Sequence, residues 1–257
     1  MHWILQNNIF SEAGWDTLLA TLERFSIAHS THKVVPFVGE LHPAPQLDHR
    51  NVICFGSYSM RHVARRERWQ PGVFDLFEQD FQQQLLHWGS HMLNAGSVVT
   101  PFADAVFGGD EMFIRPVNDS KYFAGKLFGR EEFVEWQHKV CRLNLDDGTS
   151  LTPQTLIQLA PPVTIHAEYR FWVVKGEIVT KSLYKRGDRV IYSSEVDERF
   201  DRYVRERIAE WMPHESFVID VCDTPDGMRI VEINTLNAAG FYAADVQRLV
   251  LALEEAY

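Results

Sequence analysis

Cysteine is scarce in this chain of 257 residues, which has three, at positions 54, 141 and 222. None of them lies in a CxxC pair, so the sequence has neither a disulfide framework nor the paired thiols of a zinc site. No apolar run approaches the length of a membrane span, and the opening MHWILQNN has no basic region before its short apolar stretch. We therefore expect no signal peptide and no transmembrane helix, and a soluble protein of the reducing cytoplasm.

Positive charge is also in short supply. The chain has 25 lysines and arginines against 35 acidic residues, a formal net charge of -10, and no basic tail. Such a balance disfavours nonspecific binding to nucleic-acid phosphates or to anionic membranes. We expect neither as a partner, and the composition gives no indication of oligomeric state.

Several familiar catalytic and nucleotide-binding motifs are missing. The phosphate-binding pattern GxxxxGK[ST] does not occur, and the glycines of Phe107-Gly108-Gly109-Asp110 do not form a dinucleotide fingerprint. No Ser-His-Asp or Cys-His nucleophile motif has a recognisable context. A nucleotide site in this chain must therefore be built in another way, and covalent catalysis by a side chain is not expected.

What the sequence does contain indicates a mixed α/β fold. Hydrophobic residues make up 46% of the chain, which is enough for a sizeable core in one large domain or two modest ones. The first part alternates short strands and helices, which predicts a small sheet with crossover connections. Apolar residues recur at helical spacing from 74 to 92 and stop at Asn94-Ala95-Gly96, where we place a boundary between domains 1–96 and 97–257. The second domain is strand-rich, with strands expected at 111–117, 155–159, 167–174 and 177–184.

Residues 218–237, VIDVCDTPDGMRIVEINTLN, read as a hairpin that carries two acids and an amide. Pro225-Asp226-Gly227 fits a three-residue loop, which pairs Thr224 with Met228, Cys222 with Ile230 and Asp220 with Glu232. Asn234 shares the face of the two carboxylates one pleat further along. Like charges placed opposite each other repel, so a cation between them would explain the arrangement, and Mg²⁺ prefers such oxygen ligands. The alternative is a solvent-facing side of a sheet with chance acids.

Residues 168–185, EYRFWVVKGEIVTKSLYK, pose the same question with the opposite sign. A two-residue turn at Lys175-Gly176 pairs Val174 with Glu177, Trp172 with Val179 and Arg170 with Lys181. The two cations then face each other, with Glu168 and Lys185 on the same side. A bound polyphosphate would relieve their repulsion, whereas the alternative is an exposed face of ordinary ion pairs.

A third cluster lies in residues 113–129, FIRPVNDSKYFAGKLFG. Arg115 stands near the end of an expected strand and is followed by a polar loop that contains Lys121 and several glycines. Loops of this kind can close over phosphates, because glycine lets the backbone approach a ligand. The alternative is a plain connecting loop.

Taken in order, Arg115, Lys121, Glu168-x-Arg170, Asp220 and Glu232-x-Asn234 resemble the ATP-grasp superfamily. The chain is most similar to the clade in which an arginine replaces the first-strand lysine, a clade associated with phages and with bacterial conflict or peptide-modification systems. The resemblance covers roughly residues 100–257, and its most specific part is the acidic strand pair followed by Asn237 and Gly240-Phe241-Tyr242. It implies an ATP-grasp fold preceded by a small Rossmann-like domain at 1–96.

The same resemblance implies the site residues. Asp220, Glu232 and Asn234 would bind Mg²⁺. Phosphates of ATP would be held by Arg115, Lys121 and Arg170. Beyond what the resemblance implies, we expect Arg170, helped by Lys181, to stabilise charge on the transferring phosphoryl group. Adenine would lie against a hinge formed by Ile157, Gln158 and Leu159, and the ribose near Glu168.

These assignments lead to a hypothesis of function. We expect an ATP- and Mg²⁺-dependent ligase that joins a carboxylate to an amine through an acylphosphate, acting on a peptide or amino-acid-like substrate. Two alternatives remain open at this point. One is an ATP-dependent phosphotransferase with an alcohol acceptor, and the other is a binding protein that keeps the fold without catalysis.

Overall fold

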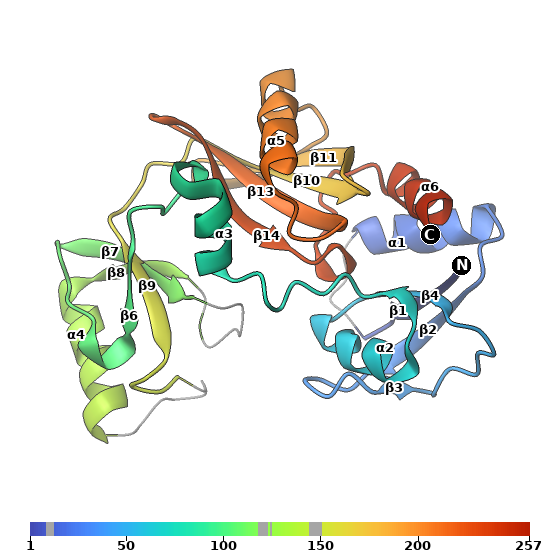
Figure 1. Ribbon diagram of the computed structural model, residues 1–257, viewed down its shortest axis with the longest axis horizontal. Coiled ribbons are helices and arrows are strands. Elements are labelled where there is room, and N and C mark those ends of the chain that lie inside the picture. The colour runs from blue at the N-terminus through green and yellow to red at the C-terminus, as the bar shows by residue number, and fades with distance from the viewer. Residues whose placement is uncertain (9–12, 118–122, 124, 144–150) are drawn as a thin grey trace. The chain divides into compact units, whose positions relative to one another are not determined.

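The computed structural model describes residues 1–8, 13–117, 123, 125–143 and 151–257, and the chain forms two compact units (Figure 1). The first unit combines both ends of the sequence, Met1–Leu76 and Ile165–Tyr257, and the second is Phe77–Thr164. The division into domains 1–96 and 97–257 stays a prediction. No helix among the described residues is long and apolar enough to cross a membrane.

The first sheet of the first unit has the strand order β3-β2-β1-β4-β5. Its strands are β1 (His2–Gln6), β2 (His29–Val34), β3 (Leu41–His42), β4 (Asn51–Phe55) and β5 (Gln70–Gly72). β1 runs parallel to β2 and β4, and β4 to β5, whereas β3 is antiparallel to β2. The helices α1 (Ala13–Arg24) and α2 (Arg61–Glu67) and the short helix η1 (Tyr58–Met60) lie in its connections, as the alternating pattern predicts.

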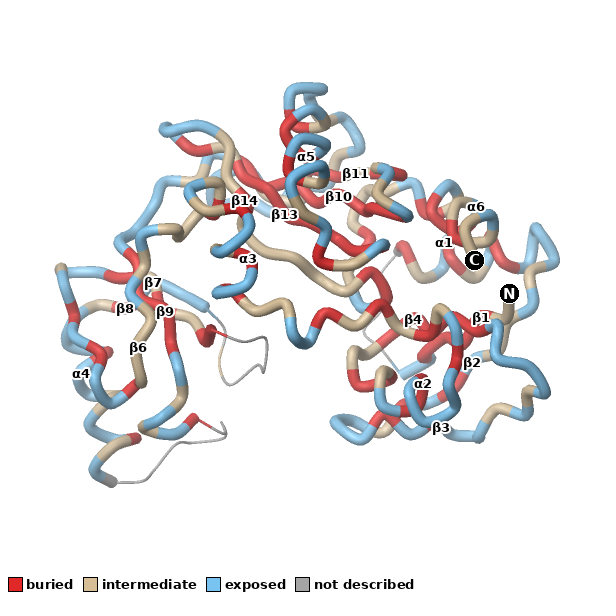
Figure 2. The backbone as a smooth tube through the Cα atoms, in the orientation of Figure 1, coloured by how far each residue is buried: buried red, intermediate tan, exposed pale blue. Residues whose placement is uncertain are grey.

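The second sheet of this unit is antiparallel, in the order β12-β11-β10-β13-β14. Its strands are β10 (Ala167–Val174), β11 (Glu177–Arg186), β12 (Arg189–Ser193), β13 (Ser216–Thr224) and β14 (Gly227–Asn234). Helix α5 (Glu198–Glu210) lies between β12 and β13 in the sequence, and η5 (Leu236–Ala238) and α6 (Val246–Ala256) follow β14. Figure 2 shows burial concentrated along β10 and β13, and every residue of β10 is buried.

One hydrophobic cluster ties the two ends of the chain together. It contains Trp3 and Phe55 from the first sheet, Trp172 and Val218 from the second, and Leu249 from α6. α1 and α6 lie side by side, although one is near the start of the chain and the other near its end (Figure 1). Burial of this shared apolar surface is the main force that holds the two sheets in one unit.

The second unit contains a smaller antiparallel sheet in the order β6-β9-β7-β8. Its elements are α3 (Phe81–Trp88), η2 (Gly89–His91), β6 (Val98–Pro101), η3 (Phe102–Asp104), β7 (Glu111–Pro116), β8 (Lys126–Gly129), α4 (Arg130–His138), a π-helical turn (Lys139–Leu143) and β9 (Leu156–Ala160). The expected helix across 74–92 is shorter, because the Asp80 side chain caps its N-terminus by accepting a hydrogen bond from the backbone N–H of Gln83. The core is built from residues such as Ile114, Phe128 and Phe133.

The first predicted hairpin register is wrong near the turn and right at the acids. Only Pro225 and Asp226 connect the strands, so Thr224 pairs with Gly227 and Cys222 with Arg229. An irregularity between Asp220 and Val221 then shifts the pairing by one residue and restores the predicted pair of Asp220 and Glu232. A β-bulge of this kind places two residues of one strand opposite one residue of its partner.

The second predicted hairpin register holds only at its turn. Val174 pairs with Glu177 as expected, but a bulge between Trp172 and Val173 places Thr180 opposite Trp172. Arg170 therefore pairs with Ser182, and Lys181 pairs with Phe171. The predicted facing cations are wrong, because one extra residue in a strand turns the side chains that follow it to the other face. A second irregularity, between Glu168 and Tyr169, pairs Glu168 with Lys185, so these two residues share a side as predicted.

Candidate functional site

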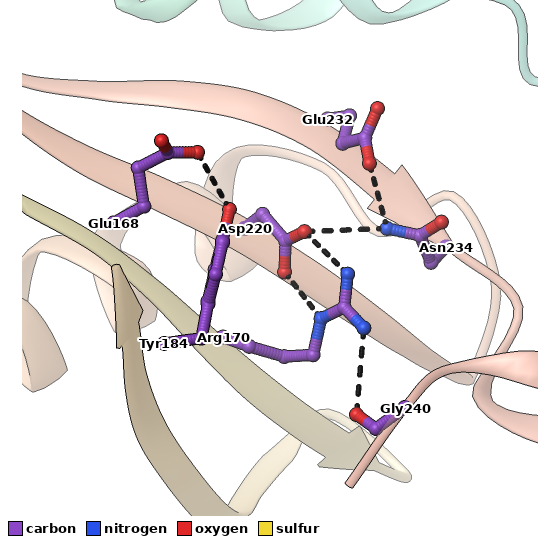
Figure 3. A network of polar contacts seen from close by, with 7 residues as sticks. All are labelled: Glu168, Arg170, Tyr184, Asp220, Glu232, Asn234 and Gly240. Atoms are coloured by element: carbon purple, nitrogen blue, oxygen red, sulfur yellow. Dashed lines mark hydrogen bonds and ion pairs between the residues drawn. The ribbon is translucent and has the colours of Figure 1, made fainter. Parts of the chain in front are cut away.

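Three neighbouring strands of the second sheet carry the site. Arg170 on β10 lies opposite Asp220 on β13, which in turn lies opposite Glu232 on β14. Asn234 is two residues beyond Glu232 and shares its face. The side chains of all four converge (Figure 3).

Arg170 and Asp220 form a two-point ion pair in the interior. The Arg170 Nε lies 2.8 Å from Asp220 Oδ1, and Nη2 lies 2.7 Å from Oδ2. Both residues are buried, at 7% and 1% exposure. Parallel hydrogen bonds of this geometry are short and directional, so each side chain fixes the orientation of the other.

The guanidinium of Arg170 is held from two further directions. Nη1 donates to the Gly240 carbonyl at 3.4 Å, and the rings of Tyr242 and Tyr184 lie 4.9 and 5.6 Å from its central carbon. Tyr242 has a positive φ of 52°, an uncommon conformation for a bulky residue. The predicted contact between Arg170 and phosphate stays a prediction.

The three predicted metal ligands are brought together. The Asn234 amide nitrogen lies 3.4 Å from Asp220 Oδ2 and 3.2 Å from Glu232 Oε1. It donates to both carboxylates, at the place where a cation would relieve their repulsion (Figure 3). Rotation of the amide would present its oxygen instead, which completes a set of three hard oxygen ligands. The residues present therefore fit Mg²⁺, with water or phosphate needed for the remaining ligands.

No group of three His, Cys, Asp or Glu side chains that could hold a metal ion is found in the part of the chain that the structure describes. The set proposed here has two carboxylates and one amide. Sites of this composition suit Mg²⁺ when a nucleotide brings its phosphate oxygens.

The electrostatics of the site favour an added cation. Burial raises the pKa of Asp220 to about 6, and the charges of Glu232 and Glu168 add to that effect, while Arg170 opposes it. Burial by itself would lower the pKa of the Arg170 guanidinium, because it disfavours the charged form. The attraction of Asp220 and its hydrogen bonds outweigh burial, so this pKa lies above its ordinary value. The carboxylate remains poorly compensated even with its partner in place.

Glu168 lies at the edge of the same cluster with both oxygens engaged. Tyr184 donates its hydroxyl to Oε2 at 2.8 Å, and Lys185 Nζ lies 2.9 Å from Oε1. Burial raises the pKa of the Tyr184 phenol, and the charges of Asp220 and Glu168 add to the shift. The ring of Tyr184 stacks on Tyr242 at 5.0 Å, and Tyr192 stacks on Tyr242 at the same distance.

The tyrosines are functional candidates that sequence reasoning misses. The motif Gly240-Phe241-Tyr242 is recognisable in the sequence, but the pattern predicts no role for its side chains. Tyr184 lies on the same strand as Lys185 and reaches Glu168. An aromatic residue next to cations in a buried strand is the signal that could have found it.

Lys181 does not lie with Arg170. Its Nζ forms an ion pair with Asp201 of α5, because the bulge in the hairpin turns it to the other side of the sheet. The lysine that accompanies the Arg170 cluster is Lys185, through Glu168.

The predicted residues of the second unit lie on adjacent strands. Arg115 on β7 pairs with Gln158 on β9. Gln158 is fully buried, and neither end of its amide has a hydrogen-bond partner among the described residues. Ile157 and Leu159 belong to the core of this unit. Lys121 and most of the polar loop around it lie outside the described residues.

Asn237 has a structural role. Its amide oxygen accepts from the Phe74 backbone N–H at 2.7 Å, and its amide nitrogen donates to the Cys54 carbonyl at 2.6 Å. It thereby joins the segment that follows β14 to the first sheet.

Similar structures support the superfamily fold. D-alanine–D-alanine ligase from Bacillus anthracis complexed with ATP is 11% identical over 99% of this chain and 96% of that one, with a TM-score of 0.65. The macrocyclase MdnC bound with precursor peptide MdnA from Microcystis aeruginosa MRC is 11% identical over 98% and 99%, with a TM-score of 0.59. The ATP-grasp ligase PsnB, complexed with a phosphomimetic variant of its minimal precursor, Mg and ADP, is 10% identical over 100% and 97%, with a TM-score of 0.57.

No curated protein matches the chain in sequence. A family model described as an ATP-grasp domain, family 3 of its clade, matches residues 47–253, which is most of the chain. The mixed α/β structure agrees with this match, since it is similar to that of a ligase complexed with ATP. The match over most of the chain shows that the chain belongs to the ATP-grasp proteins, in family 3 of the clade to which the family model is assigned.

Proposed function

We propose that this protein is an ATP- and Mg²⁺-dependent ligase that joins a carboxylate to an amine. The observation that carries the proposal is the convergence of Asp220, Glu232, Asn234 and Arg170 on one face of a rigid sheet. Two carboxylates, an amide oxygen and an oriented guanidinium are the groups that a metal-bound polyphosphate requires.

The proposed reaction has two steps. An oxygen of the substrate carboxylate attacks the γ-phosphorus of ATP, the bond to the β-phosphate oxygen breaks, and ADP leaves. The amine nitrogen then attacks the acyl carbon of the acylphosphate, inorganic phosphate leaves, and the amine gives up a proton as the amide forms. No side-chain nucleophile is needed, since positioning and charge stabilisation supply the catalysis.

Asp220, Glu232 and Asn234 would hold the metal ion, which when bound neutralises phosphate charge. Arg170 is held in place by Asp220, by the Gly240 carbonyl and by two tyrosine rings, so its guanidinium is preorganised to stabilise a developing negative charge. Lys185 replaces Lys181 as the lysine of this cluster, because it is the one that contacts Glu168.

The remaining assignments follow from the resemblance. Arg115 and Lys121 would contact phosphates, Ile157, Gln158 and Leu159 would lie against adenine, and Glu168 near the ribose. The unpartnered, buried amide of Gln158 supports a polar ligand on β9. We propose a peptide or amino-acid-like carboxylate as the substrate, because the proteins of similar fold include a D-alanine–D-alanine ligase and a macrocyclase bound with a precursor peptide. We also propose a cytoplasmic location.

The test is ADP formation from Mg²⁺ and ATP with mixtures of acids, amines and peptides, followed by mass analysis of the products. A ligase gives a product that is one water lighter than its acid and amine together. A phosphotransferase gives a phosphorylated product, and a binding protein gives neither. Either of these outcomes contradicts the proposal.

A matched variant tests the metal assignment. Glu232→Gln removes one anionic ligand but keeps the shape of the side chain, so Mg²⁺-dependent ATP affinity should fall by at least about tenfold while the fold is retained. Calorimetric titration with and without Mg²⁺ measures this. Unchanged affinity in the folded variant would show that Glu232 is not a metal ligand.

A further inference from the structure

Two neighbouring cavities lie in the first unit, away from the cluster around Arg170. The larger, of about 570 Å³, is lined by residues that include Arg50, Phe74, Lys175, His214 and Tyr257. The smaller, of about 190 Å³, is lined by Arg61, Arg65, Arg68 and Asp75 among others. Gln70 and Pro71 of β5 line both, so the cavities adjoin across this strand.

The linings are basic in a chain that is acidic as a whole. They contain five lysine and arginine side chains but two acidic side chains, Asp75 and Glu215. Both carboxylates already have cationic partners, Asp75 in Arg65 and Glu215 in Lys175. The surface therefore has positive charge left over, against a net charge of -10 for the chain.

Arg50 and Arg68 carry that surplus. Both are exposed, and the guanidinium of neither has a hydrogen bond or ion pair with another residue in the described parts of the chain. Arg61 differs, since it packs over the ring of Tyr58 at 4.4 Å. One unpartnered arginine thus borders each cavity.

The larger cavity also has an aromatic wall. The Phe74 ring lies 5.3 Å from the Tyr257 ring and 5.4 Å from the His214 ring. Burial lowers the pKa of His214, so its ring is neutral near neutral pH. An apolar group can therefore enter between the cations.

We propose that the two cavities together bind an acidic peptide segment, with an apolar side chain in the larger cavity and carboxylates on Arg50 and Arg68. The reason for choosing an acidic segment is charge complementarity, since its carboxylates would pair with the unpartnered guanidinium groups of Arg50 and Arg68. A nucleic acid is disfavoured, because it carries a phosphate at every nucleotide and would place some of them near Asp75 and Glu215, whereas a peptide can carry its carboxylates only where Arg50 and Arg68 lie.

Side chains of the peptide, rather than its backbone, would carry the binding. Among the described strands β5 pairs with β4 alone, so its other edge is open, but Pro71 has no N–H to donate to an added strand. The proposal rests on the proposed function only in taking this peptide to be part of the ligase substrate.

The test is fluorescence anisotropy without nucleotide, using a short labelled peptide of alternating glutamate and phenylalanine. The parent should bind it, and the double variant Arg50→Gln/Arg68→Gln should weaken binding by about tenfold, as expected for the loss of two exposed charge pairs. The control Arg24→Gln/Arg205→Gln loses the same charge at exposed positions on α1 and α5 and should bind like the parent.

Three results would overturn the proposal. They are equal binding of the same peptide with glutamine in place of glutamate, parent-like binding by the Arg50/Arg68 variant, and tighter binding of a single-stranded oligonucleotide that depends on the same two arginines. The proposed ligase function is tested by a separate measurement, which is ADP formation. Peptide binding without turnover would refute the ligase alone, and turnover without peptide binding would refute the docking surface alone.

Discussion

Arg170 and Asp220 depend on each other, because both are buried and each is the main charge partner of the other. Replacing Arg170 with methionine leaves the Asp220 carboxylate without its cation in the interior. We expect the variant to lose about 3 to 5 kcal/mol of unfolding free energy at neutral pH, the usual cost of breaking a buried ion pair from one side. Urea denaturation of the parent and of Arg170→Met measures the difference.

The double variant Arg170→Met/Asp220→Leu is the control, since it removes both charges. It should recover most of the lost stability, because apolar replacement of a whole buried pair is often neutral. Neither variant should retain the rise in melting temperature that excess Mg²⁺ and ATP give the parent. An Arg170→Met variant as stable as the parent would mean that Arg170 does not compensate the charge of Asp220.

At the scale of the elements, two irregularities in the β10–β11 pairing assign two lysines of one strand to different tasks, because the first turns Lys181 away and the second returns Lys185 to the side of Glu168. Lys181 contacts Asp201 of α5, and Lys185 contacts Glu168 beside the Arg170 cluster. Lys181→Met should therefore cost about 1 kcal/mol of stability or less and leave nucleotide affinity unchanged. Lys185→Met should weaken nucleotide binding with little effect on stability.

Thermal melts with and without Mg²⁺ and ATP compare the two variants under one protocol. Asp201→Asn is the companion to Lys181→Met, and the double variant tests whether their effects are shared, as expected for residues in contact. Loss of nucleotide binding in Lys181→Met but not in Lys185→Met would reverse the assignment.

At the scale of the whole molecule, Asn237 joins segments from the two ends of the sequence. It accepts from Phe74 N–H and donates to the carbonyls of Cys54 and Gly72, all in the interior. Asn237→Ala removes these three buried hydrogen bonds and should cost about 3 kcal/mol, at about 1 kcal/mol for each. Urea denaturation measures it, and a loss below about 1 kcal/mol would show that water replaces the amide.

The stability of the molecule should also depend on pH through His214. Burial lowers the pKa of His214, and its Nδ1 accepts a hydrogen bond from the Ser216 N–H at 3.3 Å. Below a pH of about 6.5 the unfolded chain binds a proton at this histidine that the folded chain resists, so the unfolding free energy falls as the pH falls.

His214→Gln should flatten this decline. The difference between the parent and the variant, followed by urea denaturation from neutral to mildly acidic pH, isolates His214 from Asp220, whose raised pKa acts in the opposite direction. Parallel curves for the two proteins would contradict the assignment.

Local patterns were sufficient for much of the fold and part of the site. Alternating strands and helices predicted the first sheet, and the acids of the last hairpin predicted that Asp220, Glu232 and Asn234 share a face. These features depend on the alternation of side chains along a strand and on short turns, and both are determined by residues that are close together in the sequence.

The sequence by itself determined the superfamily and the oxygen-rich face of one hairpin, because the order of short motifs along the chain and the alternation within one hairpin can both be read without the fold. Only the tertiary structure decided the partner of Arg170, since Asp220 is 50 residues away and reaches it through the pairing of β10 with β13. It also decided that Lys181 turns away, because a bulge has no sequence signal as clear as a turn and one extra residue exchanges the two faces of a strand. The basic surface at Arg50 and Arg68 arises in the same way, from side chains that come together only when the chain folds.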